Sequence, residues 1–119
     1  TLTAHEKACD RICAFIEGSN DPEIMLVLRP FIEEHLKLVF QKQIRDNGWE
    51  GLMLSELIDN IHGVNLIIDD TKERLHALRV SLNNGHHNTD NEENIESIRH
   101  DARDVINILY VHMPERSIA

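Results

Sequence analysis

The stretch "PEIMLVLRPFIEEHLKLVF", residues 22–40, is apolar on most of its sides when its residues are placed at helical spacing. Asp21, just before it, is a favoured N-cap residue, and Pro22 suits the first helical position. A helix that is apolar nearly all round lies at the centre of a core. We therefore predict a central helix from about residue 22 to 43.

Pro30 lies inside this run. Proline has no N–H to donate to the carbonyl of Leu26, so the sequence predicts either a kink near residues 26–30 or a break into two helices. A residue before proline also avoids the α region. We therefore expect Pro30 to push Arg29 away from helical geometry.

The rest of the chain also has helical periodicity, and no segment has the alternation typical of a strand. Gly18 and Gly63 are the expected ends of two helices, and "RDNGWEG", residues 45–51, is expected to be a loop. Capping-box pairs precede two more helices, Asp70 with Glu73 and Thr89 with Glu92. Besides the central helix, the predicted helices are residues 3–17, 52–61, 70–82 and 92–113. We predict an all-α bundle of four to five helices that forms a single domain over residues 1–119.

Composition limits the classes of function. The chain has 119 residues and a net charge of −9, which argues against broad electrostatic binding of nucleic acid but leaves room for a small basic site. No apolar run approaches the roughly 18 residues of a membrane span, and no signal peptide is recognisable, so we expect a cytoplasmic protein without membrane contact. Cys9 and Cys13 share a helix face and are interpreted as reduced, packed thiols. Because the chain starts at Thr1, we expect a fragment or a subunit of a larger system.

Arg29 and Glu33 are one helical turn apart on the most apolar segment of the chain. As an exposed pair they would contribute about 0.2–0.5 kcal/mol to helix stability. The flanking residues are apolar, however, and burying two charges costs several kcal/mol for each ion unless hydrogen bonds compensate. The residues alone leave a structural and a functional interpretation of this pair open.

His86 and His87 are adjacent in the polar stretch "LNNGHHNTD", residues 82–90. Neighbouring histidines in such a loop are most often solvated. A zinc site needs three or four ligands, and no ligand spacing of that kind occurs, so we predict no metal site. Phosphate-binding, nucleophile-elbow and calcium-loop motifs are also missing from the sequence.

Two of these motifs together resemble the HEPN superfamily. The first is an R-x-x-x-E on a central helix, here Arg29 to Glu33. The second, some fifty residues later, is the loop Leu82-Asn83-Asn84-Gly85-His86-His87, followed by an amphipathic helix. More narrowly, the chain resembles the C-terminal HEPN domain of the PrrC and RloC type of anticodon nucleases and related defence ATPases. Arg79 with His86 also fits the more common HEPN signature, an arginine followed by a histidine.

The resemblance implies a helical bundle that forms homodimers and cleaves RNA, with tRNA as the expected substrate, without a metal or other cofactor. It implies Arg29, Glu33 and His87 as catalytic residues, with His86 and Arg79 as the alternative pair. Asn83 would shape the loop. The implied setting is a bacterial toxin or phage-defence system with an ATPase domain or regulatory partner.

Two alternatives stay open at this point. Many HEPN domains have lost cleavage, so the chain is alternatively a non-catalytic dimerisation or docking module of a larger ATPase assembly, which fits a net charge of −9 more easily. A third interpretation is a small-ligand or metal-binding bundle that uses the histidines.

Overall fold

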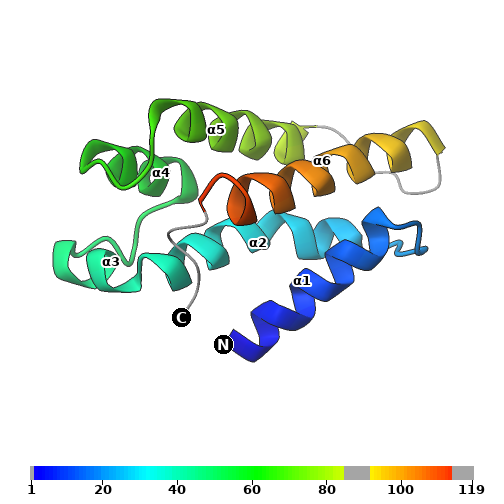
Figure 1. The fold of residues 1–119 in the computed structure, drawn as a ribbon, viewed down its shortest axis with the longest axis horizontal. Helices are drawn as coiled ribbons and strands as arrows, with labels where there is room; N and C mark the ends of the chain where they lie inside the picture. The colour runs from blue at the N-terminus through cyan, green and yellow to red at the C-terminus, as the bar shows by residue number, and fades with distance from the viewer. Residues whose placement is uncertain (1, 85–91, 114–119) are drawn as a thin grey trace.

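The structure is a computed structural model that describes residues 2–84 and 92–113. These residues form six helices and no strand, so the predicted all-α class is confirmed (Figure 1). The helices are α1 (Leu2–Ile16), α2 (Ile24–Val39), α3 (Gln41–Asn47), α4 (Leu54–Gly63), α5 (Asp69–Asn84) and α6 (Glu92–Tyr110).

The predicted central helix is confirmed as α2, which packs against α1, α5 and α6. Figure 1 shows it running through the middle of the bundle. Its buried apolar residues recur at steps of three and four and therefore form one face, whereas Leu26 is 68% exposed, so the expected burial on nearly all sides is wrong. The buried apolar residues are Ile24, Met25, Leu28, Phe31, Ile32 and Leu36.

Pro30 does not break this helix. α2 is continuous from Ile24 to Val39, and Arg29 is helical, so the alternative of two helices divided at Pro30 and the expected displacement of Arg29 are both wrong. Pro30 is exposed, so its ring takes no place in the buried core.

The break comes at Phe40 instead, whose φ of −107° and ψ of 24° separate α2 from α3. The predicted end of the central helix at residue 43 and the predicted start of the loop at residue 45 are therefore wrong. Residues 41–47 form α3, which ends at Gly48 with a left-handed φ of 70°. This short helix is the reason for six helices where the sequence predicted four to five.

The remaining helices agree with the predicted ones to within a few residues. α5 begins at Asp69, one residue before the predicted start. Thr89 and Pro114, the expected boundary residues of the last helix, lie outside the described residues. Helices α4 and α5 pack side by side, and α5 in turn packs against α2 and α6.

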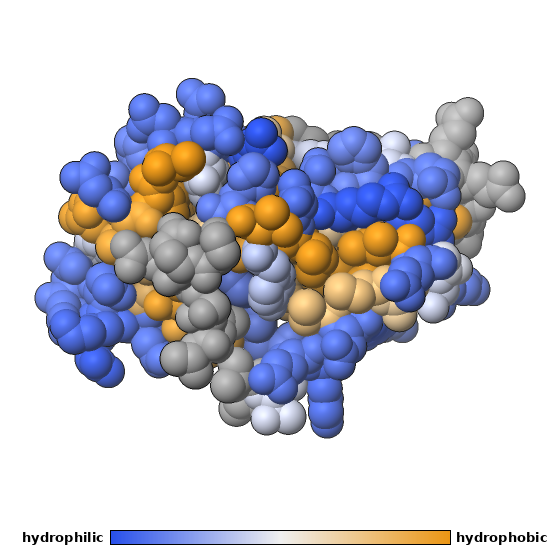
Figure 2. Space-filling model, viewed as in Figure 1, coloured by the Kyte–Doolittle hydropathy of each residue, from blue (hydrophilic) through white to orange (hydrophobic). Residues whose placement is uncertain are grey.

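The bundle surface is divided between polar and apolar residues. On the face drawn in Figure 2, apolar residues gather along the line where α6 meets α1, and polar residues cover the flanks. Ala8 and Cys9 of α1 and Ile106 of α6 are half-buried against the core. Among the described residues, no helix combines the length and the apolar character that a membrane span requires.

Candidate functional site

A cavity of about 310 Å³ opens between α2, α5 and the start of α4, and we call it the α2–α5 pocket. Its walls combine apolar side chains with two arginines, one glutamate, one serine and one asparagine. The lining residues are Arg29, Ile32, Glu33, Met53, Leu54, Ser55, Arg79, Leu82 and Asn83. Four candidate residues from two distant parts of the sequence, Arg29, Glu33, Arg79 and Asn83, are therefore brought together.

Helix α2 contributes Arg29 and Glu33. The Nε of Arg29 donates a hydrogen bond to the backbone carbonyl of Leu82, at 3.2 Å. Glu33 forms an ion pair with Lys37, one turn further along α2, with 3.5 Å between carboxylate oxygen and ammonium nitrogen. Arg29 is exposed and Glu33 half-buried, so the two charges are not buried together in the core. Both side chains line the open α2–α5 pocket and stay in contact with solvent, so the cost of desolvating their charges is small.

Helix α5 contributes Arg79 and Asn83, also one turn apart. The Nη2 of Arg79 lies 3.5 Å from Nδ1 of His76. The Nε of Arg79 is buried and has no hydrogen-bond partner among the described residues. A buried donor without an acceptor is costly, and in native proteins it calls for an explanation such as a bound ion or ligand.

The third wall is the N-terminus of α4. The first intrahelical hydrogen bond runs from the N–H of Leu57 to the carbonyl of Met53, so the N–H groups of Leu54 and Ser55 precede the helical ladder. Glu56 accepts a hydrogen bond from the N–H of Met53 at 3.3 Å. The partial positive charge of a helix N-terminus is thus added to that of the arginines.

The charge of the pocket is opposite in sign to that of the whole chain. Its lining holds two guanidinium groups against the one carboxylate of Glu33, and that carboxylate is already paired with Lys37. The net charge of −9 is therefore not spread evenly. The pocket can attract an anion even though the chain as a whole repels one.

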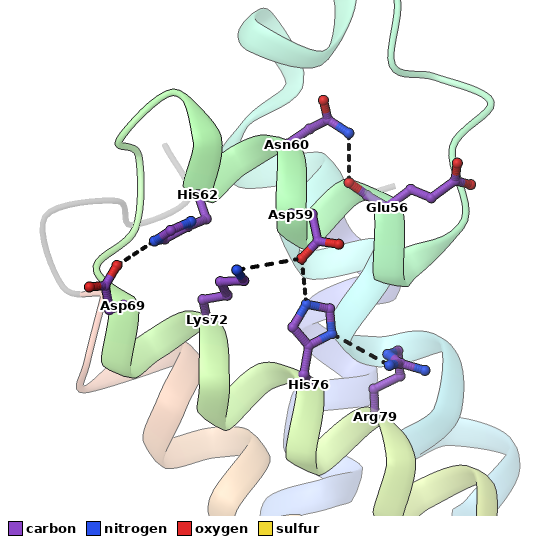
Figure 3. Close-up of polar contacts among 8 residues, drawn as sticks. All are labelled: Glu56, Asp59, Asn60, His62, Asp69, Lys72, His76 and Arg79. Carbon is purple, nitrogen blue, oxygen red and sulfur yellow. Dashed lines mark hydrogen bonds and ion pairs between the residues drawn. The ribbon is translucent and has the colours of Figure 1, made fainter.

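Behind the pocket, α4 and α5 are joined by a row of polar contacts (Figure 3). The Nε2 of His76 lies 2.7 Å from a carboxylate oxygen of Asp59, and the Nζ of Lys72 lies 4.0 Å from the same oxygen. The hydrogen bond from His76 is the main reason that the pKa of Asp59 is lowered, with further contributions from Lys72 and Arg79. Sequence reasoning missed Asp59 and His76, because nothing local shows which face of α4 meets α5.

His86 and His87 lie outside the described residues, as does Gly85. The catalytic roles that the resemblance implies for the two histidines stay predictions. The structure describes the pocket up to Asn83, three residues before His86 in the chain.

A second cluster of titratable groups links α1, α2 and α6. The Nε2 of His5 lies 3.0 Å from Nδ1 of His35, and both side chains are buried. The ring of His5 stacks on Phe31 at 4.3 Å between centroids, and the ring of Tyr110 meets His35 edge-on at 4.8 Å. Burial, and secondarily the neighbouring His5, lower the pKa of His35 to about 4. Burial also lowers the pKa of His5.

One group of side chains on α6 has the composition of a metal site. Among residues 2–84 and 92–113, the ligand atoms of His100, Asp101 and Asp104 lie within 4.8 Å of one another. Asp101 already accepts a hydrogen bond from the hydroxyl of Ser81, at 2.8 Å. Helical spacing alone brings Asp104 near both of the others, at i+4 from His100 and i+3 from Asp101, and exposed acidic groups are common without an ion.

Of these features, the α2–α5 pocket is the one that combines a cavity, cationic donors and the residues chosen from the sequence. Such an arrangement suits a phosphate or a carboxylate, since a guanidinium offers a planar fork of donors to such groups. Comparison of the chain with protein-family models, with curated proteins and with solved structures gave no match.

Proposed function

We propose that the chain is a metal-independent endoribonuclease module, directed at tRNA, of a bacterial toxin or phage-defence system, and that the α2–α5 pocket binds the phosphate that is cleaved. One observation carries the proposal. Arg29, Glu33, Arg79 and Asn83, which the resemblance to HEPN nucleases selects from two regions some fifty residues apart, line a single cavity.

The chemistry follows from the groups involved. In the proposed reaction the ribose 2′-oxygen loses its proton and attacks the adjacent phosphorus. The bond from phosphorus to the 5′-oxygen of the next nucleotide breaks, and that oxygen takes up a proton. The products are a 2′,3′-cyclic phosphate and a 5′-hydroxyl, and no oxidant or metal is consumed.

The arginines would stabilise the negative charge that develops on the phosphate during cleavage. As the phosphorus becomes five-coordinate, its equatorial oxygens gain negative charge, which preorganised donors stabilise. Arg29 is tied to the Leu82 carbonyl through Nε, which holds its guanidinium at the pocket, and a guanidinium offers a planar fork of donors to a phosphate. Glu33 would orient Arg29 or take part in proton transfer, and a loop histidine, His87 or His86, would move protons near neutral pH.

The test is cleavage of purified total tRNA in the presence of EDTA. We expect the parent chain to cleave, and Arg29→Ala, Glu33→Ala and His87→Ala each to abolish cleavage while the far-ultraviolet circular dichroism is retained. Arg45→Ala and Glu34→Ala are matched controls, because both residues are exposed and neither lines the α2–α5 pocket. We expect both to cleave like the parent.

Two results would contradict the proposal. One is an absence of cleavage by the parent chain at high protein concentration, with its expected partner ATPase added. The other is parental activity in all three pocket and loop variants. The ends of the products give an independent check, since a 5′-hydroxyl is labelled directly by polynucleotide kinase and a 5′-phosphate is not.

The net charge of −9 favours a second candidate, a non-catalytic module that dimerises or docks on a larger ATPase assembly. An apolar groove of about 360 Å³ between α1 and α2 suits such a contact, and Leu26 and Pro30 line it from the exposed side of α2. Sedimentation of the parent and of Leu26→Glu tests dimerisation. A dimer that Leu26→Glu dissociates, together with no cleavage of tRNA, would favour this candidate.

A further inference from the structure

Three side chains form a continuous polar chain from α4 to the pocket: Asp59, His76 and Arg79 (Figure 3). Nε2 of His76 is 2.7 Å from Asp59, and Nδ1 of the same ring is 3.5 Å from Nη2 of Arg79. His76 is half-buried between the two, and only Arg79 of the three lines the α2–α5 pocket.

The two contacts of His76 fix how its ring is protonated. An ionised carboxylate only accepts hydrogen bonds, and a guanidinium only donates them. The ring must therefore donate from Nε2 to Asp59 and accept at Nδ1 from Arg79. The neutral tautomer with its proton on Nε2 satisfies both partners, and any other form loses one of them.

This arrangement restricts Arg79 without using up its donors. An arginine side chain has about 2 kcal/mol of rotamer entropy, which a free arginine loses when it binds a ligand. Here Nη2 is already directed by His76, whereas Nε is buried and has no acceptor among the described residues. Side chains fixed in advance bind a ligand more tightly, because less freedom is lost on binding.

We infer that Asp59 and His76 are positioning residues, which hold the guanidinium of Arg79 at the α2–α5 pocket as a second binding group for the phosphodiester backbone of the nucleic acid. The inference rests on the proposed function for the identity of the ligand. It adds that Asp59 of α4 contributes to the site through His76 of α5, a histidine outside the sequence motifs.

The experiment measures affinity for a fluorescein-labelled single-stranded DNA oligonucleotide by anisotropy. DNA has the same phosphodiester backbone but lacks the 2′-hydroxyl, so it is bound without being cleaved. We expect Arg79→Gln to weaken binding about tenfold, since hydrogen bonds to charged groups contribute most. We also expect the slope of log affinity against log salt to fall by about 0.7, the value for one phosphate contact on a single strand.

Two substitutions of His76 separate positioning from simple packing. In His76→Asn the side-chain oxygen takes the place of Nδ1, so the acceptor for Arg79 is kept. In His76→Gln the amide takes the place of Nε2, so the contact with Asp59 is kept and the acceptor is lost. We expect His76→Gln to weaken binding several-fold, and His76→Asn to retain most of the affinity.

The double variant His76→Gln/Arg79→Gln completes the cycle. If His76 acts through Arg79, the double variant binds no more weakly than Arg79→Gln alone, and Asp59→Ala likewise has no effect in the Arg79→Gln background. His62→Ala is the matched control, because it removes another histidine–aspartate contact between α4 and α5, 2.5 Å from Nε2 of His62 to Asp69, without reaching Arg79. We expect parental affinity for it.

Several results would overturn the inference: additive losses in the double variant, equal behaviour of His76→Asn and His76→Gln, or no binding of the oligonucleotide by the parent. Binding that follows this cycle in a chain that cleaves no tRNA would support the inference and contradict the ribonuclease proposal. Cleavage of tRNA by a chain whose double variant shows additive losses of affinity would support the ribonuclease proposal and contradict the inference.

Discussion

Nε of Arg29 donates a hydrogen bond of 3.2 Å to the backbone carbonyl of Leu82, and this contact joins two segments that lie 53 residues apart in the chain. It fixes α2 against the last turns of α5, and it directs the rest of the Arg29 guanidinium. The same contact brings the R-x-x-x-E segment next to the segment that leads into the histidine loop.

The first prediction concerns Arg29→Lys. Lysine keeps the positive charge but has no Nε to hold the Leu82 carbonyl and no planar fork for a phosphate. Under the proposed function, we expect single-turnover cleavage of tRNA to slow by about 100-fold, as for loss of an oxyanion donor. Arg29 is exposed, so we expect the free energy of unfolding in urea to fall by less than about 1 kcal/mol. Parental cleavage by Arg29→Lys would show that charge alone suffices.

The sequence predicted the helices well where periodicity and end signals agree. Gly18 and Gly63 lie at helix ends, and residues 92–113 keep the spacing of an amphipathic helix. The break at Phe40 was missed because neither glycine nor proline marks it, and buried residues keep helical spacing across it, from Phe40 to Ile44. The one proline in that region, Pro30, indicated a break where tertiary packing on both sides keeps the helix continuous.

The candidate site was predictable only within each helix. Arg29 and Glu33 share a face by their spacing alone, and so do Arg79 and Asn83. That these two faces meet depends on how α2 packs against α5, which no local pattern encodes. Similarly, the pairing of His76 with Asp59 depends on the register of α4 against α5, and the pairing of His5 with His35 depends on that of α1 against α2.

The second prediction compares two leucines of α2. Leu28 is fully buried, with 0% of its surface exposed, whereas Leu26, two positions earlier and so on the opposite side of the helix, is 68% exposed. We expect Leu28→Ala to lower the free energy of unfolding by about 2–5 kcal/mol, because it removes buried methyl groups and leaves a cavity. We expect Leu26→Ala to change it by less than about 0.5 kcal/mol. Urea denaturation followed by circular dichroism measures both, and similar losses would contradict the burial of Leu28.

The third prediction concerns Pro30→Ala. Proline in a helix interior is about 3 kcal/mol less favourable than alanine. Removing it also gives the unfolded chain more conformational freedom, which lowers the stability of the folded protein by up to about 1 kcal/mol. Pro30 is exposed, so little packing is lost. We therefore expect Pro30→Ala to raise the free energy of unfolding by about 2 kcal/mol. Glu34→Ala, at another exposed position of α2, is the control and should change it little. A destabilised Pro30→Ala would mean that the bundle requires the local geometry of proline.

The fourth prediction concerns pH and the contact between His5 and His35. The pKa of His35 is lowered to about 4 in the folded protein, mainly by burial, whereas an unfolded chain has the ordinary value near 6.5. Above pH 6.5 both states are neutral, and His35 adds no pH dependence. Between pH 6.5 and 4 the unfolded chain binds a proton that the folded protein does not. Stability therefore falls by about 1.4 kcal/mol for each pH unit, and by about 3 kcal/mol in total.

This loss is measured as the difference in slope between the parent and His35→Gln, from urea denaturation at several values between pH 8 and pH 4. His35→Gln has no proton to bind at this position, so we expect its stability to depend less on pH, whatever its absolute value. His100→Gln is the matched control, because the His100 side chain is 72% exposed, and its variant should follow the parent. The prediction is wrong if His35→Gln and the parent lose stability in parallel below pH 6.5. That result would mean that the folded protein protonates His35 as readily as the unfolded chain does, and that burial beside His5 does not oppose its protonation.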